Sequence, residues 1–451
     1  MDLVKEVQAA GVVGAGGAGF PTHIKLGAQA ECFIVNAVEC EPLIATDKYL
    51  CRQEADKIIK GIQVIGQVLG AKRLIIALKE SYVEEIACLE KAIQEAKATI
   101  EIVTLSPFYP AGDEQSLVYA VLGKIVPERG LPLDVGAVVD NVGTVVDVWD
   151  AAQGKPVTHK ILSIVGEVDH PTLLQVPLGT PIKECLAQAK MKSGEMAVLL
   201  GGPMMGRILT DPGDIDGAVV TKTLGNLLVL PRSHELVRRG TRSIQGIKGQ
   251  ALSACIQCQM CTDLCPRFLI GHWVKPHEVM RHAFKEDSLG DDAFIRAFGS
   301  AVNCCDCGIC ELFACPMGLS PRRMNGYFKE KIRERGLTIE RGTNPREHPM
   351  IAHRRIPTHR LIARINLQAY EGQKPRECGQ WLPSRVRIPL KMHIGSPARP
   401  LVAVGDVVAL GQLIGEAQEG LSVNLHASMA GTVTEVTDYG ITIEGKGGTR
   451  G

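Results

Sequence analysis

The sequence is poor in aromatic residues and has no excess of charge of either sign. Phe, Trp and Tyr make up 4% of its 451 residues, too few for the stacking platforms that bind single-stranded nucleic acids. The chain contains 50 Lys and Arg against 49 Asp and Glu, which leaves a net charge of +1. Because nucleic-acid binding normally requires a clustered basic surface, we expect no nucleic-acid partner.

A long hydrophobic run is also missing. No apolar stretch reaches the roughly 18 residues that indicate a membrane-spanning helix. Residues 1–10 lack the basic and then apolar pattern of a secretory signal. We therefore expect a cytoplasmic protein with no membrane span.

The length and the alternating patterns indicate a multidomain α/β plus α+β protein. A chain of 451 residues is too long for one hydrophobic core, so we expect about three or more domains. In residues 1–150, apolar runs that predict strands alternate with segments of helical periodicity, which favours an α/β layer with a largely parallel sheet. The predicted elements are strands at 32–37, 73–78 and 100–105 and helices at 56–69 and 82–98.

The composition and the predicted secondary structure change several times along the rest of the chain. Short strands and turns rich in Gly and Pro give way to helix-forming sequence around cysteines, and the chain ends in alternating strands punctuated by glycines. We predict an α+β domain at 155–206 with a helix at 182–191, a linker with a short ribbon at 207–250, a helical domain at 251–335 that includes helices at 276–285 and 322–335, an extended connector at 336–384 and an all-β module at 385–451.

Cysteine is plentiful, and its placement indicates metal chemistry. Nine of the 15 cysteines fall between Cys255 and Cys315. A reducing compartment disfavours disulfides, so such a cluster points to metal or redox chemistry. We expect the scattered cysteines to be small buried hydrophobes; they are Cys32, Cys40, Cys51, Cys88, Cys185 and Cys378.

Two cysteine motifs predict two 4Fe–4S clusters. The first reads C-x2-C-x2-C-x3-C-P from Cys255 to Pro266, the spacing of bacterial ferredoxin sites. A zinc site is the alternative, although zinc ligands usually form two separated pairs. The second motif runs from Cys304 to Pro316 and has four residues instead of three before its last cysteine. Cys305 is an extra thiol there, and a register that uses Cys305 in place of Cys304 stays open.

The ligands of the two clusters are expected to cross between the motifs. In ferredoxins with two clusters the fourth cysteine of each motif binds the other cluster. We therefore assign Cys255, Cys258, Cys261 and Cys315 to cluster 1 and Cys304, Cys307, Cys310 and Cys265 to cluster 2.

A glycine-rich loop near the N-terminus is a candidate phosphate site. Its glycines, at Gly14, Gly16, Gly17 and Gly19, permit positive φ angles and a close approach of backbone N–H groups to a phosphate. The loop matches neither a P-loop nor a G-x-G-x-x-G motif after a strand. Tight packing is therefore an equally open explanation of the glycines alone.

Together with the segments 35–42, 109–115 and 141–144, this loop resembles a known family. The chain is similar to the flavin-bearing, NADH-oxidising subunit of respiratory complex I, to the RnfC subunit of the Rnf complex and to the PduS-type cobalamin reductases of propanediol-utilisation microcompartments. The segment 201–206 is similar to one that ends a β-grasp-like domain of the SLBB type in RnfC proteins. The C-terminal segment 393–427 resembles the barrel-sandwich module of RnfC, at the other end of the chain as in the PduS type.

The resemblance implies FMN and NADH as cofactor and electron donor. Lys25 and the glycine loop would hold the phosphate, Phe20 would stack on the nicotinamide, and Glu41 would contact the dinucleotide. The residues that would surround the rest of the flavin are Asn36, Glu39, Tyr109, Gly112, Glu114, Asn141 and Thr144. Ordinary packing is the alternative at each position, and hydride transfer to a flavin requires no catalytic residue of its own.

The same resemblance implies an electron-transfer oxidoreductase that reduces cob(III)alamin for a coenzyme B12-dependent pathway. The expected partners are a corrinoid or another low-potential acceptor, an adenosyltransferase and a microcompartment shell protein, and the expected location extends to the microcompartment lumen. No lysine occupies the tip at 427–430, so we interpret the barrel-sandwich module as a scaffold or docking unit rather than a carrier. Two alternatives remain: an RnfC-like subunit that passes electrons between NADH and ferredoxin, and a non-enzymatic iron–sulfur hub.

Overall fold

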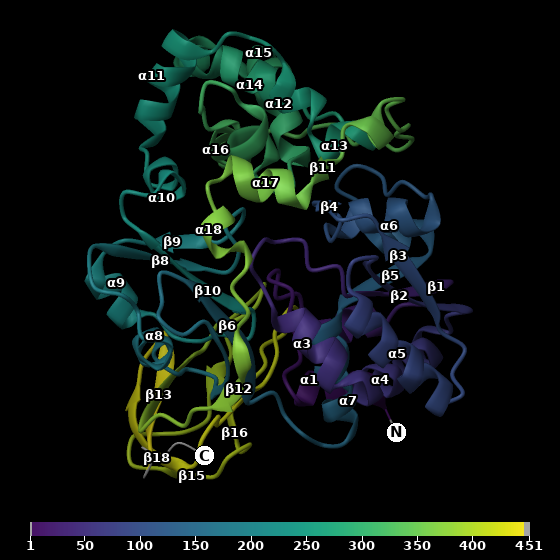
Figure 1. Cartoon of the computed structure of the whole chain (residues 1–451), viewed down its shortest axis with the longest axis vertical. Helices are drawn as coiled ribbons and strands as arrows, with labels where there is room; N and C mark the ends of the chain where they lie inside the picture. Colours follow the sequence, from purple (N-terminus) through teal and green to yellow (C-terminus); the bar gives the residue numbers. More distant parts are fainter. Residues whose placement is uncertain (1, 446–451) are drawn as a thin grey trace.

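The structure is a computed structural model that describes residues 2–445, apart from the side chains of residues 376–378. The N-terminal domain lies beside the sheet domain that follows it, and the C-terminal module lies below the sheet domain (Figure 1). The helical cysteine-rich domain lies at the top of the same view. Cys378, which we expect to be a buried hydrophobe, lies outside the described residues.

The N-terminal domain is a four-stranded sheet between two layers of helices. Its strands have the order β3-β2-β1-β5 and every neighbouring pair is parallel, so the predicted parallel sheet is confirmed. Phe33 and Val35 share a core with helices α4, α5 and α7, whereas Ile34 shares the opposite core with α6. This alternation buries both faces of β1, which explains its continuous apolar sequence.

The elements of this domain are close to the predicted ones. They are α1 (Leu3–Ala9), α2 (Thr22–Leu26), β1 (Cys32–Asn36), α3 (Thr46–Gln53), α4 (Ala55–Leu69), β2 (Arg73–Lys79), α5 (Val83–Glu95), β3 (Glu101–Leu105), β4 (Phe108–Tyr109), α6 (Glu114–Leu122), η1 (Pro132–Val135), β5 (Ala137–Asn141) and α7 (Val142–Ala152).

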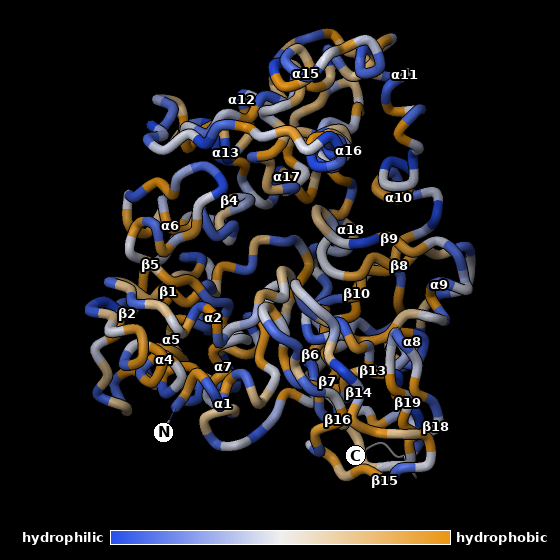
Figure 2. The backbone as a smooth tube through the Cα atoms, turned by 180° about the vertical axis from the view of Figure 1, so that it is seen from behind, coloured by the Kyte–Doolittle hydropathy of each residue, from blue (hydrophilic) through white to orange (hydrophobic). Residues whose placement is uncertain are grey.

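A six-stranded mixed sheet, which we call the sheet domain, follows. Its strand order is β12-β7-β6-β10-β8-β9, and α8 packs on β6 and β7. The elements are β6 (His159–Gly166), β7 (Thr172–Pro177), α8 (Ile182–Ala189), β8 (Met196–Leu200), β9 (Arg207–Leu209), α9 (Pro212–Gly217) and β10 (Asn226–Pro231). Strand β10 consists mostly of hydrophobic residues and lies in the interior of the molecule (Figure 2).

The prediction of a linker with a short ribbon at 207–250 misses that strands β9 and β10 in its first half belong to the six-stranded sheet. Strand β10 pairs in parallel with β6 and antiparallel with β8, and Leu227, Leu228 and Val229 are fully buried. A buried inner strand reads as a short apolar run without alternation. Because glycines and charged residues flank this run, its sequence surroundings favour a linker.

The cysteine-rich domain is helical, as predicted. Its elements are α10 (Glu235–Gly240), α11 (Ile244–Ala254), α12 (Met260–Asp263), α13 (Pro266–Leu269), α14 (Pro276–His282), η2 (Ala283–Ser288), α15 (Asp291–Phe298), η3 (Gly299–Asn303), η4 (Ile309–Ala314) and α16 (Pro321–Glu334). Phe294, Phe298 and Phe328 are fully buried at its centre, and the rings of Phe298 and Phe328 stack at 3.6 Å.

The stretch 336–384 is more ordered than the predicted connector. It contains η5 (Ile351–His353), β11 (Ile356–Pro357), α17 (Thr358–Arg364), α18 (Gln368–Glu371) and β12 (Arg376–Gln380). Strand β11 pairs with β4 of the N-terminal domain, and β12 pairs with β7 of the sheet domain. These short elements depend on contacts with other domains, so they leave no periodicity in the sequence.

The C-terminal module consists of two small sheets. Their strand orders are β13-β19-β18-β15 and β14-β16-β17. The strands are β13 (Arg385–Pro389), β14 (Arg399–Pro400), β15 (Val407–Val408), β16 (Leu413–Glu416), β17 (Leu425–His426), β18 (Gly431–Val436) and β19 (Gly440–Glu444). The module shares a hydrophobic core with the N-terminal domain, and Ile394 N–H donates a 3.0 Å hydrogen bond to Gly19 C=O at the glycine loop.

Candidate functional site

A cavity of about 1240 Å³ lies where the N-terminal domain, the sheet domain and the cysteine-rich domain meet. Pockets for a single drug-sized ligand usually measure roughly 300–1,000 Å³, so this one exceeds that range. Its lining includes eight of the residues that the resemblance assigns to the flavin and dinucleotide: Gly16, Gly17, Asn36, Glu39, Glu41, Tyr109, Gly112 and Asn141.

The glycine loop forms one wall of the cavity. Its ends are tied down, because Gly14 N–H donates to Phe20 C=O at 2.9 Å and Ala15 N–H donates to Thr144 Oγ1 at 2.9 Å. Gly17 has a φ of +115°, and a Cβ there would meet nothing within 4 Å. At Gly17 the glycine is therefore required by the backbone conformation, and it leaves open space on the cavity side.

Polar side chains at the ends of the parallel strands form a second wall. Asn36, the last residue of β1, donates from Nδ2 to Gly112 C=O at 2.9 Å. Asn141, the last residue of β5, caps α7 by accepting from Gly143 N–H at 2.8 Å and donates to Asp47 at 2.8 Å. This end of the sheet is where open α/β folds bind ligands, and the two asparagines are held rigidly there.

Two half-buried carboxyl groups face the cavity from the loop after β1. Burial, followed by the nearby carboxylates, raises the pKa of Glu39 to about 8. Burial likewise raises the pKa of Glu41 to about 7, against hydrogen bonds from the backbone of Met204 and Met205. Glu41 Oε1 has no hydrogen-bond partner, so a polar group of a bound molecule would satisfy it.

Tyr109 connects this cavity to the cysteines. Its fully buried hydroxyl donates a 2.7 Å hydrogen bond to Cys307 C=O. Cys305 and Cys307 themselves line the cavity. The nucleotide-sized space therefore extends from the glycine loop to the second cysteine motif.

The other predicted residues lie outside the lining. Lys25 binds protein groups instead of facing the cavity: its Nζ lies 3.1 Å from Glu114, 3.4 Å from Asp140 and 2.6 Å from Val139 C=O. The assignments of Lys25 to a phosphate and of Glu114 to the flavin are thus not supported by this geometry. Gly14, Gly19, Phe20 and Thr144 also lie outside the lining. Thr144 contacts the loop only through the hydrogen bond that its hydroxyl accepts from Ala15 N–H.

The four cysteines assigned to cluster 1 lie together. Burial raises the pKa of Cys261 to about 12, and the neighbouring thiols of Cys315, Cys258 and Cys255 also raise it. These thiols are therefore close enough to interact. Cys258 is exposed to solvent, so this group reaches the surface.

The four cysteines assigned to cluster 2 form a deeper group. Burial raises the pKa of Cys310 well above its usual range, followed by the effects of Cys304 and Cys265. The hydrogen bond with Cys305 and burial raise the pKa of Cys307, and the thiols of Cys265 and Cys310 raise it further. Cys265, Cys307 and Cys310 are buried, and the interaction of Cys310 with Cys261 links this group to the first.

Cys305 differs from its neighbours. A hydrogen bond with Cys307 lowers its pKa to about 7 against the effect of burial, and Arg267 adds to the lowering. Cys304 and Cys305 both remain near the deeper group, since both affect the pKa of Cys265. The geometry alone thus leaves the choice of register between these two thiols open.

The extra residue before Cys315 is absorbed by a π-helical turn. Segment η4 is a single π-type turn, and one inserted residue is what such a turn accommodates. Cys310 and Cys315 are five residues apart, so the wider turn keeps both thiols in their groups. The irregular spacing of the second motif therefore has a local structural cause.

The donor set fits iron–sulfur clusters better than zinc. The thiols interact in two groups of four, and four cysteine thiolates hold each 4Fe–4S cluster, whereas zinc ligands usually form two separated pairs. The glycine loop, the open space at Gly17 and the unpaired Glu41 oxygen fit a flavin nucleotide in the cavity.

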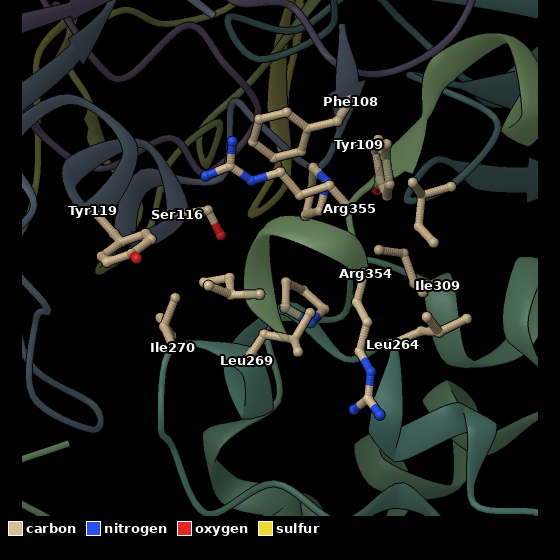
Figure 3. A pocket seen from close by; sticks show the side chains of 14 residues that line it. Phe108, Tyr109, Ser116, Tyr119, Leu264, Leu269, Ile270, Ile309, Arg354 and Arg355 are labelled. Atoms are coloured by element: carbon tan, nitrogen blue, oxygen red, sulfur yellow. The ribbon is translucent and has the colours of Figure 1, made fainter. Parts of the chain in front are cut away.

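Buried contacts hold the cysteine-rich domain against the N-terminal domain. Arg267, which directly follows the first motif, forms a 2.8 Å ion pair with Asp113, the residue that caps α6. Beside it Tyr109, Ile309 and Leu264 surround a gap of about 40 Å³ (Figure 3). This space is about the size of one water molecule, so it is a packing gap rather than a ligand site.

Sequence reasoning missed the polar residues that other elements bring to the cavity. Asp47 comes from α3, Asp147 from α7, and Lys160 from β6 of the sheet domain. The sequence signal was weak: Asp147 and Lys160 stand in apolar elements, where charged residues are rarely buried, whereas Asp47 stands in the polar helix α3. Their convergence depends on domain packing and could not be predicted.

No helix in the described part of the chain is long and apolar enough to cross a membrane.

Three family descriptions match the chain. Residues 7–150 match the Nuo51 FMN-binding domain, residues 254–320 a 4Fe–4S dicluster domain, and residues 378–448 the RnfC barrel sandwich hybrid domain. These matches confirm the predicted FMN and iron–sulfur cofactors and the barrel-sandwich module at the C-terminal end.

Curated relatives cover almost the whole chain. Cobalamin reductase PduS of Citrobacter freundii is 39% identical over 442 residues, which are 97% of this chain and 95% of that protein. Cobalamin reductase PduS of Salmonella typhimurium is 38% identical over 445 residues, or 98% and 96% of the two chains. A component of the ion-translocating oxidoreductase complex of Pseudomonas aeruginosa is 34% identical over 275 residues, which are 59% of this chain and 33% of that one.

Proposed function

Because the chain belongs to the PduS cobalamin reductase family, we propose that it takes electrons from NADH and delivers them to a corrinoid, reducing cob(III)alamin toward the cob(II) and cob(I) states. The observation that carries this proposal is the cavity that runs from the glycine loop to Cys307. A nucleotide bound in this cavity would lie directly against the deeper cysteine group.

The cavity residues would hold FMN and NADH. Gly16 and Gly17 would adjoin the phosphate end, Asn36, Gly112 and Asn141 the middle of the flavin, and Glu39 and Glu41 the nicotinamide side. When bound, the flavin converts a two-electron hydride into single electrons, and the clusters conduct those electrons one at a time. The chain's own residues bind, orient and shield these groups.

The two cysteine groups would form a path from the cavity to the surface. Cluster 2, held by Cys304, Cys307, Cys310 and Cys265, would lie next to the flavin. Cluster 1, held by Cys255, Cys258, Cys261 and Cys315, would lie at the surface, where Cys258 is exposed. The corrinoid would therefore meet the protein near the first motif.

The cellular setting follows from the same premise. A corrinoid reduced toward cob(I)alamin is the substrate of an adenosyltransferase, so we infer that such an enzyme is a partner. We further propose that the chain binds a microcompartment shell protein and lies in the lumen of a bacterial microcompartment.

An RnfC-like role is the second candidate. The 34% identity to a component of an ion-translocating oxidoreductase complex supports it. In that role the chain would pass electrons between NADH and ferredoxin and would require membrane partners for turnover.

The test is NADH-dependent reduction of cob(III)alamin by the purified chain with its clusters and flavin, followed anaerobically by corrinoid absorbance. We expect reduction by the chain alone. The variant Cys258→Ser should lose corrinoid reduction and keep flavin reduction by NADH, whereas Cys88→Ser, which changes a cysteine outside both groups, should keep both. A chain that reduces ferredoxin but no corrinoid would favour the RnfC-like role.

A further inference from the structure

The predicted phosphate ligand Lys25 is already committed to other groups. Its ammonium contacts Glu114, Asp140 and Val139 C=O. The pKa of Lys25 is raised because the two carboxylates outweigh the opposing effect of burial. The glycine loop therefore needs a different cation if it holds a phosphate.

Lys160 is placed to supply that cation from another domain. It lies on β6 of the sheet domain, lines the cavity, and points its Nζ to within 3.5 Å of Ala15 C=O in the glycine loop. No carboxylate within the described residues 2–445 comes within 4.0 Å of this ammonium group. Its half-buried ammonium group thus lies at the loop without an ion-pair partner.

The other cations of the cavity are engaged or exposed. Lys57 pairs with Asp150 at 3.3 Å and with Glu54 at 3.2 Å. Lys155 lies 4.0 Å from Asp150, and 68% of its side chain is exposed. These ion pairs direct both ammonium groups toward Asp150 rather than toward the glycine loop.

Two carboxyl groups also face Lys160, Asp47 from α3 and Asp147 from α7. Burial raises the pKa of each to about 6, and Lys160 counteracts that rise. Asp47 is further occupied by its 2.8 Å hydrogen bond from Asn141. A purely structural role for Lys160 would be to balance these two carboxyl groups, and the experiment must separate that role from phosphate binding.

We propose that Lys160 binds the phosphate of the flavin nucleotide held at the glycine loop, so that the sheet domain completes the nucleotide site of the N-terminal domain. The inference rests on the proposed function for the presence of FMN. An ammonium group and the N-terminal end of α7, an 11-residue helix that begins beside the loop, would together offset the charge of a phosphate.

The test compares FMN with riboflavin, which lacks only the phosphate. Both are titrated anaerobically into the flavin-depleted full chain, and binding is followed by quenching of flavin fluorescence. For Lys160→Gln we expect FMN to bind about 10- to 100-fold more weakly, as the loss of a charge-assisted hydrogen bond implies. Riboflavin affinity should stay within about twofold, since riboflavin makes no phosphate contact.

Two further variants serve as controls. Lys160→Arg should restore most of the preference for FMN because it keeps the positive charge, and Lys155→Gln should leave both affinities unchanged. Unaltered riboflavin binding also shows that the variant is folded.

Equal weakening of FMN and riboflavin by Lys160→Gln would overturn the inference in favour of charge balance with Asp47 and Asp147. Unchanged FMN affinity, including the case in which only NADH binding falls, would overturn it as well. A wild-type chain that binds neither flavin would contradict the proposed function itself, so the two failures are distinguishable.

Discussion

At the scale of single residues, Tyr109 joins the nucleotide cavity to the cysteines. Its ring lines the cavity, and its hydroxyl donates to the carbonyl of Cys307 at 2.7 Å. The residue is 1% exposed, so no water can replace this hydrogen bond. Tyr109 therefore fixes the position of the second motif relative to a bound flavin.

Tyr109→Phe should weaken this connection without removing the cavity. The Cys307 carbonyl would be left buried and unpaired, which costs about 1–3 kcal/mol of folding free energy. We expect flavin reduction by NADH to persist and cluster reduction to slow, as measured by anaerobic stopped-flow absorbance.

Tyr82→Phe is the matched control. It removes a part-buried 3.1 Å hydrogen bond to Glu39 C=O in the same domain, and this bond does not involve either cysteine motif. Equal slowing of cluster reduction in both variants would contradict a specific role for Tyr109.

The lysines mark the limit of prediction at this scale. The family resemblance assigned the phosphate to Lys25, whereas Lys160 is 145 residues away from Ala15. The dicluster domain could be predicted because motif spacing is a local property, and residues 254–320 match a 4Fe–4S dicluster domain. Which lysine faces a cavity between domains depends on packing that no local pattern encodes.

At the scale of elements, the close contact of α4 and α7 holds the layer that carries Asn141. A Cβ added to Gly61 would lie 2.7 Å from both the carbonyl oxygen and the Cγ1 of Val145. The two helices approach one another only because this position has no side chain. Helix α7 begins directly after Asn141, so its position sets the end of the cavity.

Gly61→Ala should lower the free energy of unfolding by about 1–3 kcal/mol, because overpacking forces the helices apart. The measurement is denaturant unfolding followed by circular dichroism. Gly249→Ala is the control, since it lies within α11 with open space around it and should be neutral or up to about 1 kcal/mol stabilising. Unchanged stability of Gly61→Ala would show that α4 and α7 can separate freely.

Helices and strands could be predicted from the sequence where the pattern within their own segment determines them. Strands β1 and β2 and helices α4 and α5 were predicted because apolar runs and helical periodicity extend over their whole length. Strand β10 and the short strands β11 and β12 were missed because they form only through pairing with distant segments. The π-helical turn at η4 could be inferred only as an odd spacing.

At the scale of the whole molecule, the C-terminal module docks on the glycine loop through a buried histidine cluster. His23, His393 and His426 are buried, and each has a ring nitrogen without a hydrogen-bond partner. Lys222 of the sheet domain reaches Gly11 C=O at 2.5 Å and Asn424 C=O at 3.3 Å. Three domains thus meet at this cluster.

Acid should weaken this docking. Burial, and then Lys222, lowers the pKa of His426 to about 4, whereas a solvent-exposed histidine titrates near 6.5. The docked state therefore binds fewer protons, so its stability is complete above pH 6.5 and falls toward pH 4 by up to roughly 1.4 kcal/mol per pH unit for each such group. Hydrogen exchange of residues 385–445 at pH 7.5 and 5.5 measures this directly.

His426→Gln should flatten that pH dependence because it removes the titrating group. Exchange in the helices of the cysteine-rich domain provides the internal reference. If residues 385–445 exchange equally at both pH values, the histidine cluster does not control docking.

As a whole, we propose, the chain is an electron path from a flavin nucleotide through the deeper cluster to the surface cluster. The most direct measurement is an anaerobic absorbance spectrum with iron and flavin analysis, before and after addition of NADH. We predict about eight irons and one FMN per chain, with both flavin and cluster absorbance bleached by NADH. Eight irons without flavin, or no response to NADH, would contradict the account and leave an iron–sulfur hub whose N-terminal domain serves only for docking.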